Sequence, residues 1–301
     1  MLVVAALGGN ALLRRGEPLT AGAQRANVQI AARSLAAIVR AGHNLVVTHG
    51  NGPQVGLLAL QGAAYKPDEA YPLDVLGAET EGMIGYIIEQ ELENALNHDR
   101  PVATLLTQVV VDQRDPAFEK PTKFVGPVYG REEAEARAKA AGWHIAQDGD
   151  KWRRVVPSPK PLEIPDMRVI RLLLDKGVVV ICAGGGGIPV LRRDDGSTIG
   201  VEAVIDKDAA SALLAQQLKA DALLLLTDVE AIYRDFGTPD AAPIHSLTVA
   251  QARSLDLPAG SMGPKLTAAA DFAASGGLSG IGRLEDALAI LDGQAGTRIH
   301  N

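Results

Sequence analysis

The sequence of 301 residues contains a single cysteine, Cys182, and few aromatic residues. One cysteine excludes a disulfide bond within the chain, and this usage is typical of proteins from a reducing cytoplasm. Aromatic residues make up 4% of the chain, too few to predict a stacking surface for single-stranded nucleic acid. These two shortages favour a cytoplasmic protein that does not bind nucleic acid.

The chain also lacks an excess of positive charge and any long apolar run. It has 29 lysines and arginines against 36 acidic residues, a net charge of −7, so an anionic substrate must be attracted by a local cluster of cations. The start, MLVVAALGGNALL, has no basic segment, and Gly-Gly-Asn interrupts its apolar run. We therefore expect neither a signal peptide nor a membrane span.

Several familiar catalytic motifs are missing as well. The sequence has no G-x-x-x-x-G-K-[ST] loop, and it has no H-R-D or D-F-G motif of a protein kinase. Its six histidines are scattered without metal-ligand spacing. We expect no metal site made by the protein alone.

Short apolar runs alternate with helix-length segments along most of the chain. The runs expected to form strands lie at residues 2–7, 45–48, 101–112, 178–182 and 220–229. The clearest helices between them are expected at 20–41 and 79–97. Such alternation is typical of a mainly parallel sheet covered by helices on both faces. The sequence therefore predicts an α/β fold.

Residues 126–165 interrupt this alternation. The segment contains both tryptophans, Trp143 and Trp152, a charged helical stretch and a proline-rich end. We expect a small subdomain that protrudes from the main sheet, with a simple surface insertion as the alternative.

Three of the expected strands run directly into glycine-rich loops. Their sequences are GGNA at 8–11, HGNGPQ at 49–54 and AGGGGIP at 183–189. The carboxyl ends of parallel strands share one edge of a sheet, where such folds bind ligands, so the loops are expected to converge on an anion site. Tight turns are the alternative. Asn10 and Asn51 are neutral donors suited to oxyanions, although asparagine also serves as a turn residue, and His49 is a candidate general base.

Two lysines stand in unusual positions for phosphoryl transfer, which requires cations on the moving group. Lys265 is expected in the first turn of a helix, where the helix dipole disfavours a cation unless a phosphate lies there too. Lys207 lies between Asp206 and Asp208 just ahead of an alanine- and leucine-rich helix. The alternatives are solvated lysines and an aspartate that merely caps the helix.

Six motifs, in this order, carry a resemblance to a known family. They are ALGGNAL, THGNGPQVGLL, PTK followed by GP and Y, CAGGGGIPV, AVIDKD and GSMGPK. With the closing GQAGTRI they make nearly the whole chain resemble the carbamate kinases of the amino acid kinase family. The lysine of PTK, Lys123, is the feature that most separates these enzymes from related kinases. Phe124 departs from the family pattern, in which proline is common.

The resemblance implies a three-layer αβα sandwich with a small protruding subdomain. It implies an acceptor lobe at 1–175, with a flap at about 126–165, and a nucleotide lobe at 176–301. The implied reaction is reversible, Mg²⁺-dependent phosphoryl transfer between ATP and carbamate, giving ADP and carbamoyl phosphate, in a homodimer. Such enzymes often run toward ATP in arginine or purine-ureide catabolism. The alternatives are a related kinase for another small carboxylate and a non-catalytic nucleotide sensor.

The resemblance also implies a role for individual residues. The catalytic set would be Lys123, Lys207, Asp208 and Lys265. The phosphoryl and acceptor set would be Gly8, Gly9, Asn10, Gly50, Asn51, Gly52, Gly184, Gly185 and Gly186. The nucleotide side would be lined by Thr227, Asp228, Tyr233, Met262 and Gly263, with Mg²⁺ bridged by the nucleotide phosphates rather than held by the protein.

Overall fold

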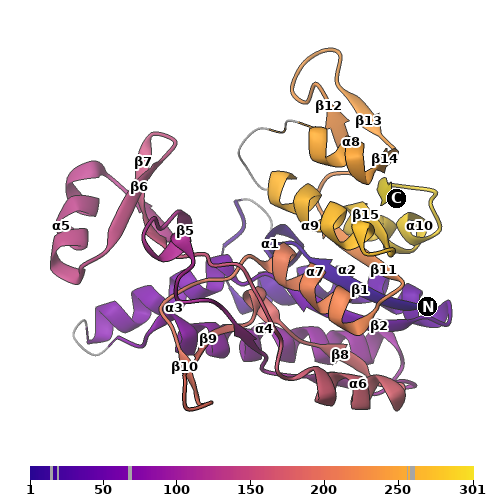
Figure 1. The fold of residues 1–301 in the computed structure, drawn as a ribbon, viewed down its shortest axis with the longest axis horizontal. Helices are drawn as coiled ribbons and strands as arrows, with labels where there is room; N and C mark the ends of the chain where they lie inside the picture. Colours follow the sequence, from indigo (N-terminus) through magenta and orange to yellow (C-terminus); the bar gives the residue numbers. More distant parts are fainter. Residues whose placement is uncertain (14–15, 19, 67–69, 256, 258–261) are drawn as a thin grey trace.

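The computed structural model describes residues 1–301 except 14–15, 19, 67–69, 256 and 258–261, and of residues 10 and 11 it describes only the backbone. In this part of the chain the largest sheet has eight strands in the order β14-β16-β15-β11-β1-β2-β8-β3 (Figure 1). The strands are β1 (Leu2–Leu7), β2 (Asn44–His49), β3 (Val102–Thr104), β8 (Val179–Ile181), β11 (Ala222–Thr227), β14 (Ser246–Thr248), β15 (Leu278–Arg283) and β16 (Thr297–His300). Only β14 and β16 run against the others, so the prediction of a mainly parallel sheet is confirmed.

Alternate residues of β1 separate the two faces of the sheet. Val3 and Leu7 pack in a cluster with α2 (Ala21–Arg40), α4 (Leu73–Ala95) and α10 (Ala287–Leu291). Val4 and Ala6 pack in a second cluster with α6 (Met167–Asp175), α7 (Lys207–Leu218) and α9 (Met262–Ala274). A strand buried on both faces is an apolar run without polar alternation, as in the sequence of β1. The three-layer αβα sandwich is confirmed.

One predicted strand is divided between two sheets. The run at 101–112 forms β3 and then β4 (Gln108–Val110), which joins β9 (Ile188–Arg192) and β10 (Thr198–Gly200) in a separate sheet. The chain leaves the main sheet before Thr107, whose backbone N–H donates to the Glu81 carboxylate. The prediction of a single strand is wrong because a buried tertiary hydrogen bond turns the chain there.

A separate antiparallel sheet with one helix lies at residues 123–156, where the sequence predicted a flap at about 126–165, and we call this unit the flap. It consists of β5 (Lys123–Tyr129), α5 (Arg131–Ala141), β6 (His144–Asp148) and β7 (Lys151–Val156), and it stands apart from the main sheet in Figure 1. Arginines stack on aromatic rings there, in the pairs Arg131–Trp152, Arg137–Tyr129, Arg153–Phe124 and Arg154–Trp143. Such pairs add stability to a unit with few fully buried residues.

The remaining elements connect or cover these units. They are α1 (Gly9–Leu12), α3 (Gly52–Tyr65), α8 (Val249–Ser254), β12 (Ile232–Arg234), β13 (Ala242–Ile244) and short 3₁₀ turns at 116–118, 184–186 and 284–286. No helix in the described ranges is long and apolar enough to cross a membrane.

Candidate active site

Glycine loops follow three neighbouring strands at one edge of the main sheet. The Gly8 N–H donates to the Leu226 carbonyl at 2.9 Å, and the Gly50 N–H donates to the Leu7 carbonyl at 3.1 Å. A Cβ atom on Gly50 would lie 3.4 Å from the Gly9 nitrogen and 3.7 Å from Cδ of Lys207. The first two loops and a candidate catalytic lysine are therefore in direct contact, as the topology predicts.

Lys207 and Lys265 meet at one carboxylate. The Lys265 ammonium donates to Oδ2 of Asp208 at 2.8 Å, and the Lys207 ammonium pairs with Oδ1 of the same residue. Asp208 is 4% exposed and Lys265 is 6% exposed. The alternative of freely solvated lysines is therefore wrong for this pair.

The electrostatics of this cluster follow from burial and charge. Burial alone would raise the pKa of Asp208, but the two ammonium groups lower this pKa from 3.8 to about 2. Burial lowers the pKa of Lys207, and repulsion by Lys265 lowers it further. Asp208 is therefore ionised at neutral pH, and its negative charge opposes the loss of a proton from Lys207.

Asp206, and not Asp208, caps helix α7. Its Oδ1 atom accepts from the backbone N–H groups of Asp208 at 3.0 Å and Ala209 at 3.2 Å. Its Oδ2 atom accepts from the Lys123 ammonium of the flap at 2.9 Å. Burial opposes the ionisation of Asp206, but the charge of Lys123 together with the hydrogen bonds from Lys123 and the Ala209 N–H lowers its pKa. Asp206 therefore has two roles: it caps α7, as the sequence suggests, and it forms the ion pair with Lys123 that joins the flap to this helix.

The run Gly184–Gly187 packs against protein side chains from the second loop and from α4. The Gly184 N–H donates to Oε1 of Glu81 at 2.6 Å, and a Cβ atom on Gly184 would collide with the His49 ring. A Cβ atom on Gly185, whose φ is +66°, would collide with the side chain of Asn51. Glycine is required here by close packing and by a left-handed backbone. The predicted contact of Gly184, Gly185 and Gly186 with a ligand stays a prediction.

His49 is fully buried behind the second loop. Its Nδ1 atom lies 3.1 Å from the Gly50 carbonyl, and its Nε2 atom has no hydrogen-bond partner among the described residues. Burial lowers the pKa of His49 from 6.5 to about 4. The ring is therefore neutral at physiological pH and a weak proton acceptor, which argues against the role of general base.

The residues expected on the nucleotide side lie at the end of β11, in β12 and at the start of α9. A Cβ atom on Gly8 would lie 3.8 Å from Cα of Thr227, so the first loop adjoins the end of β11. The Thr227 hydroxyl donates to Asp228 at 3.1 Å, and the Tyr233 hydroxyl donates to Glu230. Met262 and Gly263 open helix α9, one turn before Lys265. The side chain of Asn10 lies outside the described residues.

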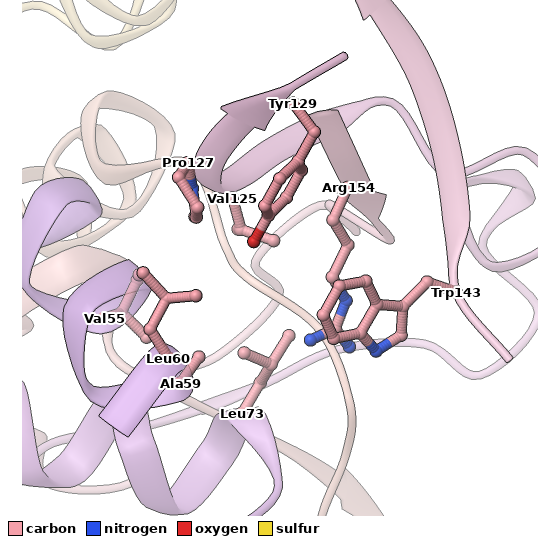
Figure 2. A pocket seen from close by; sticks show the side chains of 11 residues that line it. Val55, Ala59, Leu60, Leu73, Val125, Pro127, Tyr129, Trp143 and Arg154 are labelled. Atoms are coloured by element: carbon pink, nitrogen blue, oxygen red, sulfur yellow. The ribbon is translucent and has the colours of Figure 1, made fainter. Parts of the chain in front are cut away.

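Helix α3 supports the flap through a contact between two glycines. A Cβ atom on Gly56 would lie 2.7 Å from Cα of Gly126 in β5. Beside this contact is an apolar pocket, shown in Figure 2, between Val55 of α3 and Tyr129 of the flap. The indole of Trp143 and the guanidinium of Arg154 line its opposite side (Figure 2). The backbones of the flap and of α3 therefore meet directly where Gly56 lies against Gly126.

Four buried polar residues of this region were not predicted from the sequence. Thr80 and Glu81 of α4 bond to the second loop and to the glycine run. The hydroxyls of Thr48 and Ser211 lie 2.6 Å apart and join the end of β2 to the first turns of α7. A threonine or glutamate on a helix reads as a solvated residue, so the sequence carries no signal for these contacts.

The described residues include no group of three or more His, Cys, Asp or Glu side chains arranged to hold a metal ion. Asp206 and Asp208, at the start of α7, are instead bonded to lysines.

Comparison with known proteins shows the family of this chain. Residues 1–281 match the amino acid kinase family. The chain belongs to the amino acid kinase family. Among the curated members of this family, the carbamate kinase of Rhizobium meliloti (strain 1021) is 58% identical over 302 residues, covering 99% of this chain and 93% of that protein. The carbamate kinase of Haemophilus influenzae is 57% identical and covers 99% of this chain and 96% of that protein.

A solved member of the amino acid kinase family has the same fold. The carbamate kinase from Giardia lamblia bound to AMP-PNP superposes with a TM-score of 0.91 at 42% identity, covering 99% of this chain and 98% of that one. The resemblance inferred from the six motifs is confirmed.

Proposed function

We infer that this protein is a carbamate kinase, which catalyses reversible phosphoryl transfer between ATP and carbamate to give ADP and carbamoyl phosphate. The observation that carries this conclusion is the buried Lys207–Asp208–Lys265 cluster beside the converging glycine loops. The identity of 58% with a carbamate kinase over nearly the full length supports it. A kinase for another small carboxylate is the remaining alternative, since small acceptors leave few marks in a sequence.

In the direction of ATP synthesis, an oxygen of the ADP β-phosphate attacks the phosphorus of carbamoyl phosphate. The bond from phosphorus to the carbamate oxygen breaks, and carbamate leaves as an oxyanion. Neither the attacking group nor the leaving group carries a proton that must be moved, so no general base is needed. Catalysis then consists of positioning and charge stabilisation, and Lys207 and Lys265 supply the charge.

We propose roles for the surrounding residues, and their places in the fold support these roles. Gly8 and Gly9 approach the transferred group without side chains, beside Lys207. Gly50, Asn51 and Gly52 form the carbamate side of the same edge. Lys123 reaches from the flap toward α7, so we propose that it leaves Asp206 for the anionic carbamoyl phosphate when this substrate binds.

We propose that the nucleotide brings Mg²⁺ with it. The oxygens of Asp208 are both engaged by lysines, and Asp206 is bonded to Lys123 and to backbone N–H groups. The donor set around the loops therefore suits phosphate rather than a metal ion, and the phosphate oxygens would hold the cation. The bound metal would offset phosphate charge, and Thr227, Asp228, Tyr233, Met262 and Gly263 would line the nucleotide itself.

We propose that the two lobes meet near residues 175 and 176, with the acceptor bound by the first lobe and the nucleotide by the second.

We also propose that the protein is a homodimer. Apolar side chains are exposed on and beside α4, namely Tyr86 at 57%, Leu106 at 55% and Ile199 at 42%. Burial of such a surface between two copies would supply the driving force. Light scattering during gel filtration measures the mass directly. A cytoplasmic location stays a prediction.

The test of the activity is ATP formation from Mg-ADP and carbamoyl phosphate, run beside acetyl phosphate and a reaction without enzyme. Rapid ATP formation with carbamoyl phosphate alone is expected. Lys207→Ala and Lys265→Ala should each lose most turnover while remaining folded by circular dichroism. No ATP from folded protein that binds ADP would refute the proposed acceptor, and near-normal turnover of either variant would remove that lysine from the mechanism.

A further inference from the structure

Two consecutive residues of α4 hold two different glycine loops. The Thr80 hydroxyl accepts from the Asn51 side-chain amide at 2.9 Å, and it bonds in turn to the Leu76 and Gly77 carbonyls. The Glu81 carboxylate accepts from the Gly184 N–H at 2.6 Å and from the Thr107 N–H at 3.1 Å. Two adjacent residues of α4 thus bond to the second loop, to the glycine run and to the point where the chain leaves the main sheet.

Both side chains are buried where an apolar residue would otherwise be expected. Thr80 is 0% exposed and Glu81 is 1% exposed. No ion pair of Glu81 with a lysine, arginine or histidine occurs in the described part of the chain, and burial raises its pKa to about 8. Burial of an acidic side chain costs free energy unless its polar atoms are satisfied, and the N–H groups of Gly184 and Thr107 satisfy those of Glu81.

The two loops also contact each other directly. The Asn51 side chain fills the space where a Cβ atom of Gly185 would be. The backbone N–H of Ala183, the residue before Gly184, donates to the Thr107 hydroxyl at 2.9 Å. The Asn51 amide therefore lies against the backbone of Gly185, and movement of either one toward the other displaces both loops.

We propose that Thr80 and Glu81 are positioning residues that set the spacing between the second glycine loop and the run Gly184–Gly187. Among the described residues, no hydrogen bond or ion pair joins Thr80 or Glu81 to the lysine cluster, so they act on the reaction through the Asn51 amide and the Gly184 backbone. The consequence for carbamate placement rests on the proposed function. The spacing itself is a property of the fold and can be measured without any substrate.

The first experiment compares Thr80→Val, which removes the hydroxyl at constant shape, with Thr80→Ser, which retains it. A small displacement of the reacting groups slows the reaction strongly. Thr80→Val should therefore lower kcat/KM for carbamoyl phosphate about tenfold and leave the KM for ADP within about twofold. Thr80→Ser should behave like the wild type. Glu81→Met, which leaves two N–H groups unsatisfied, should lose more than Glu81→Gln, which retains one acceptor.

Glu91 provides a matched control on the same helix. It is also buried, at 7% exposed, but it pairs with Arg25 at 3.0 Å, away from both loops. Glu91→Gln should leave kcat/KM unchanged. If Thr80→Val and Glu81→Met lower stability but change kcat/KM no more than this control, the residues are merely structural and the proposal is refuted. Equal losses in Thr80→Ser and Thr80→Val would refute it as well.

Amide hydrogen exchange provides a readout that does not depend on the activity. In Thr80→Val, exchange should accelerate in peptides covering residues 50–54 and also in those covering 183–187, with α2 unchanged. Faster exchange in only one of these loops would show that the loops are not coupled through α4 and would overturn the proposal. Wild-type protein without kinase activity would instead refute the proposed function and leave the exchange result to decide the spacing.

Discussion

Replacement of Asp208 by asparagine removes one negative charge between two lysines and exchanges one of its two acceptor oxygens for a donor nitrogen. The amide has nearly the same shape as the carboxylate and can still accept one hydrogen bond. Lys207 and Lys265, at 13% and 8% side-chain exposure, then lose the carboxylate that bonds to both of them. The variant therefore isolates the effect of charge from the effect of packing.

The magnitude follows from burial and from the pKa of Asp208. Removal of one partner of a buried ion pair costs about 3–5 kcal/mol, and we expect a free energy of unfolding about 3 kcal/mol lower, since the retained amide offsets part of the loss. The pKa of Asp208 lies at about 2 in the fold and at 3.8 otherwise. The carboxylate therefore stabilises the fold fully above about pH 4, and this contribution is lost as the pH falls toward 2.

Urea unfolding at pH 7 and ATP formation give the two readouts. Loss of a lysine proton removes charge stabilisation from the transition state, so kcat should fall about 10²–10³-fold. The double variant Asp208→Asn with Lys265→Met restores charge balance and should regain about 1–2 kcal/mol while remaining inactive. A single variant with wild-type stability, or a double variant no more stable than the single one, would refute the assignment of Asp208 as the shared counter-ion.

Three further predictions concern the flap, its support and the buried histidine. Lys123→Ala should raise the KM for carbamoyl phosphate about tenfold or more with ADP affinity intact, because a charge on the substrate loses its partner. Gly56→Ala should raise the same KM about fivefold, because its Cβ atom would lie 2.7 Å from Cα of Gly126 and displace the flap. Gly62→Ala on the same helix meets only an ordinary contact at 3.9 Å and serves as the control. His49 has a pKa of about 4 in the fold against 6.5 otherwise, so wild-type stability should fall as the pH drops from 6.5 to 4, and His49→Asn should show a weaker fall in urea titrations.

Each of these predictions has an outcome that contradicts it. A large loss of ADP affinity in Lys123→Ala would place the flap on the other substrate. Equal kinetics in Gly56→Ala and Gly62→Ala would show that the flap does not depend on the glycine contact. An unchanged slope of stability against pH in His49→Asn would show that the buried ring titrates normally.

Much of the site could be predicted because its parts are local in the chain. An apolar run followed by glycines marks the end of a buried strand, and parallel strands bring such ends to one edge whatever lies between them. For the same reason Lys207 and Lys265 could be placed at helix starts from the adjacent Asp206 and Pro264. The strand predicted at 101–112 failed because its break depends on Glu81, which is distant in the sequence.

The sequence by itself determined the α/β class, the three loops at strand ends and the positions of the lysines, since strand and helix patterns act over a few residues. Only the tertiary structure decided which groups meet. Asp208 pairs with Lys265, 57 residues away, and Asp206 pairs with Lys123, 83 residues away. Glu81 accepts a hydrogen bond from Gly184, 103 residues away. Hydrogen bonds and ion pairs of this kind depend on burial and on the three-dimensional approach of distant segments, and no local pattern of residues records either.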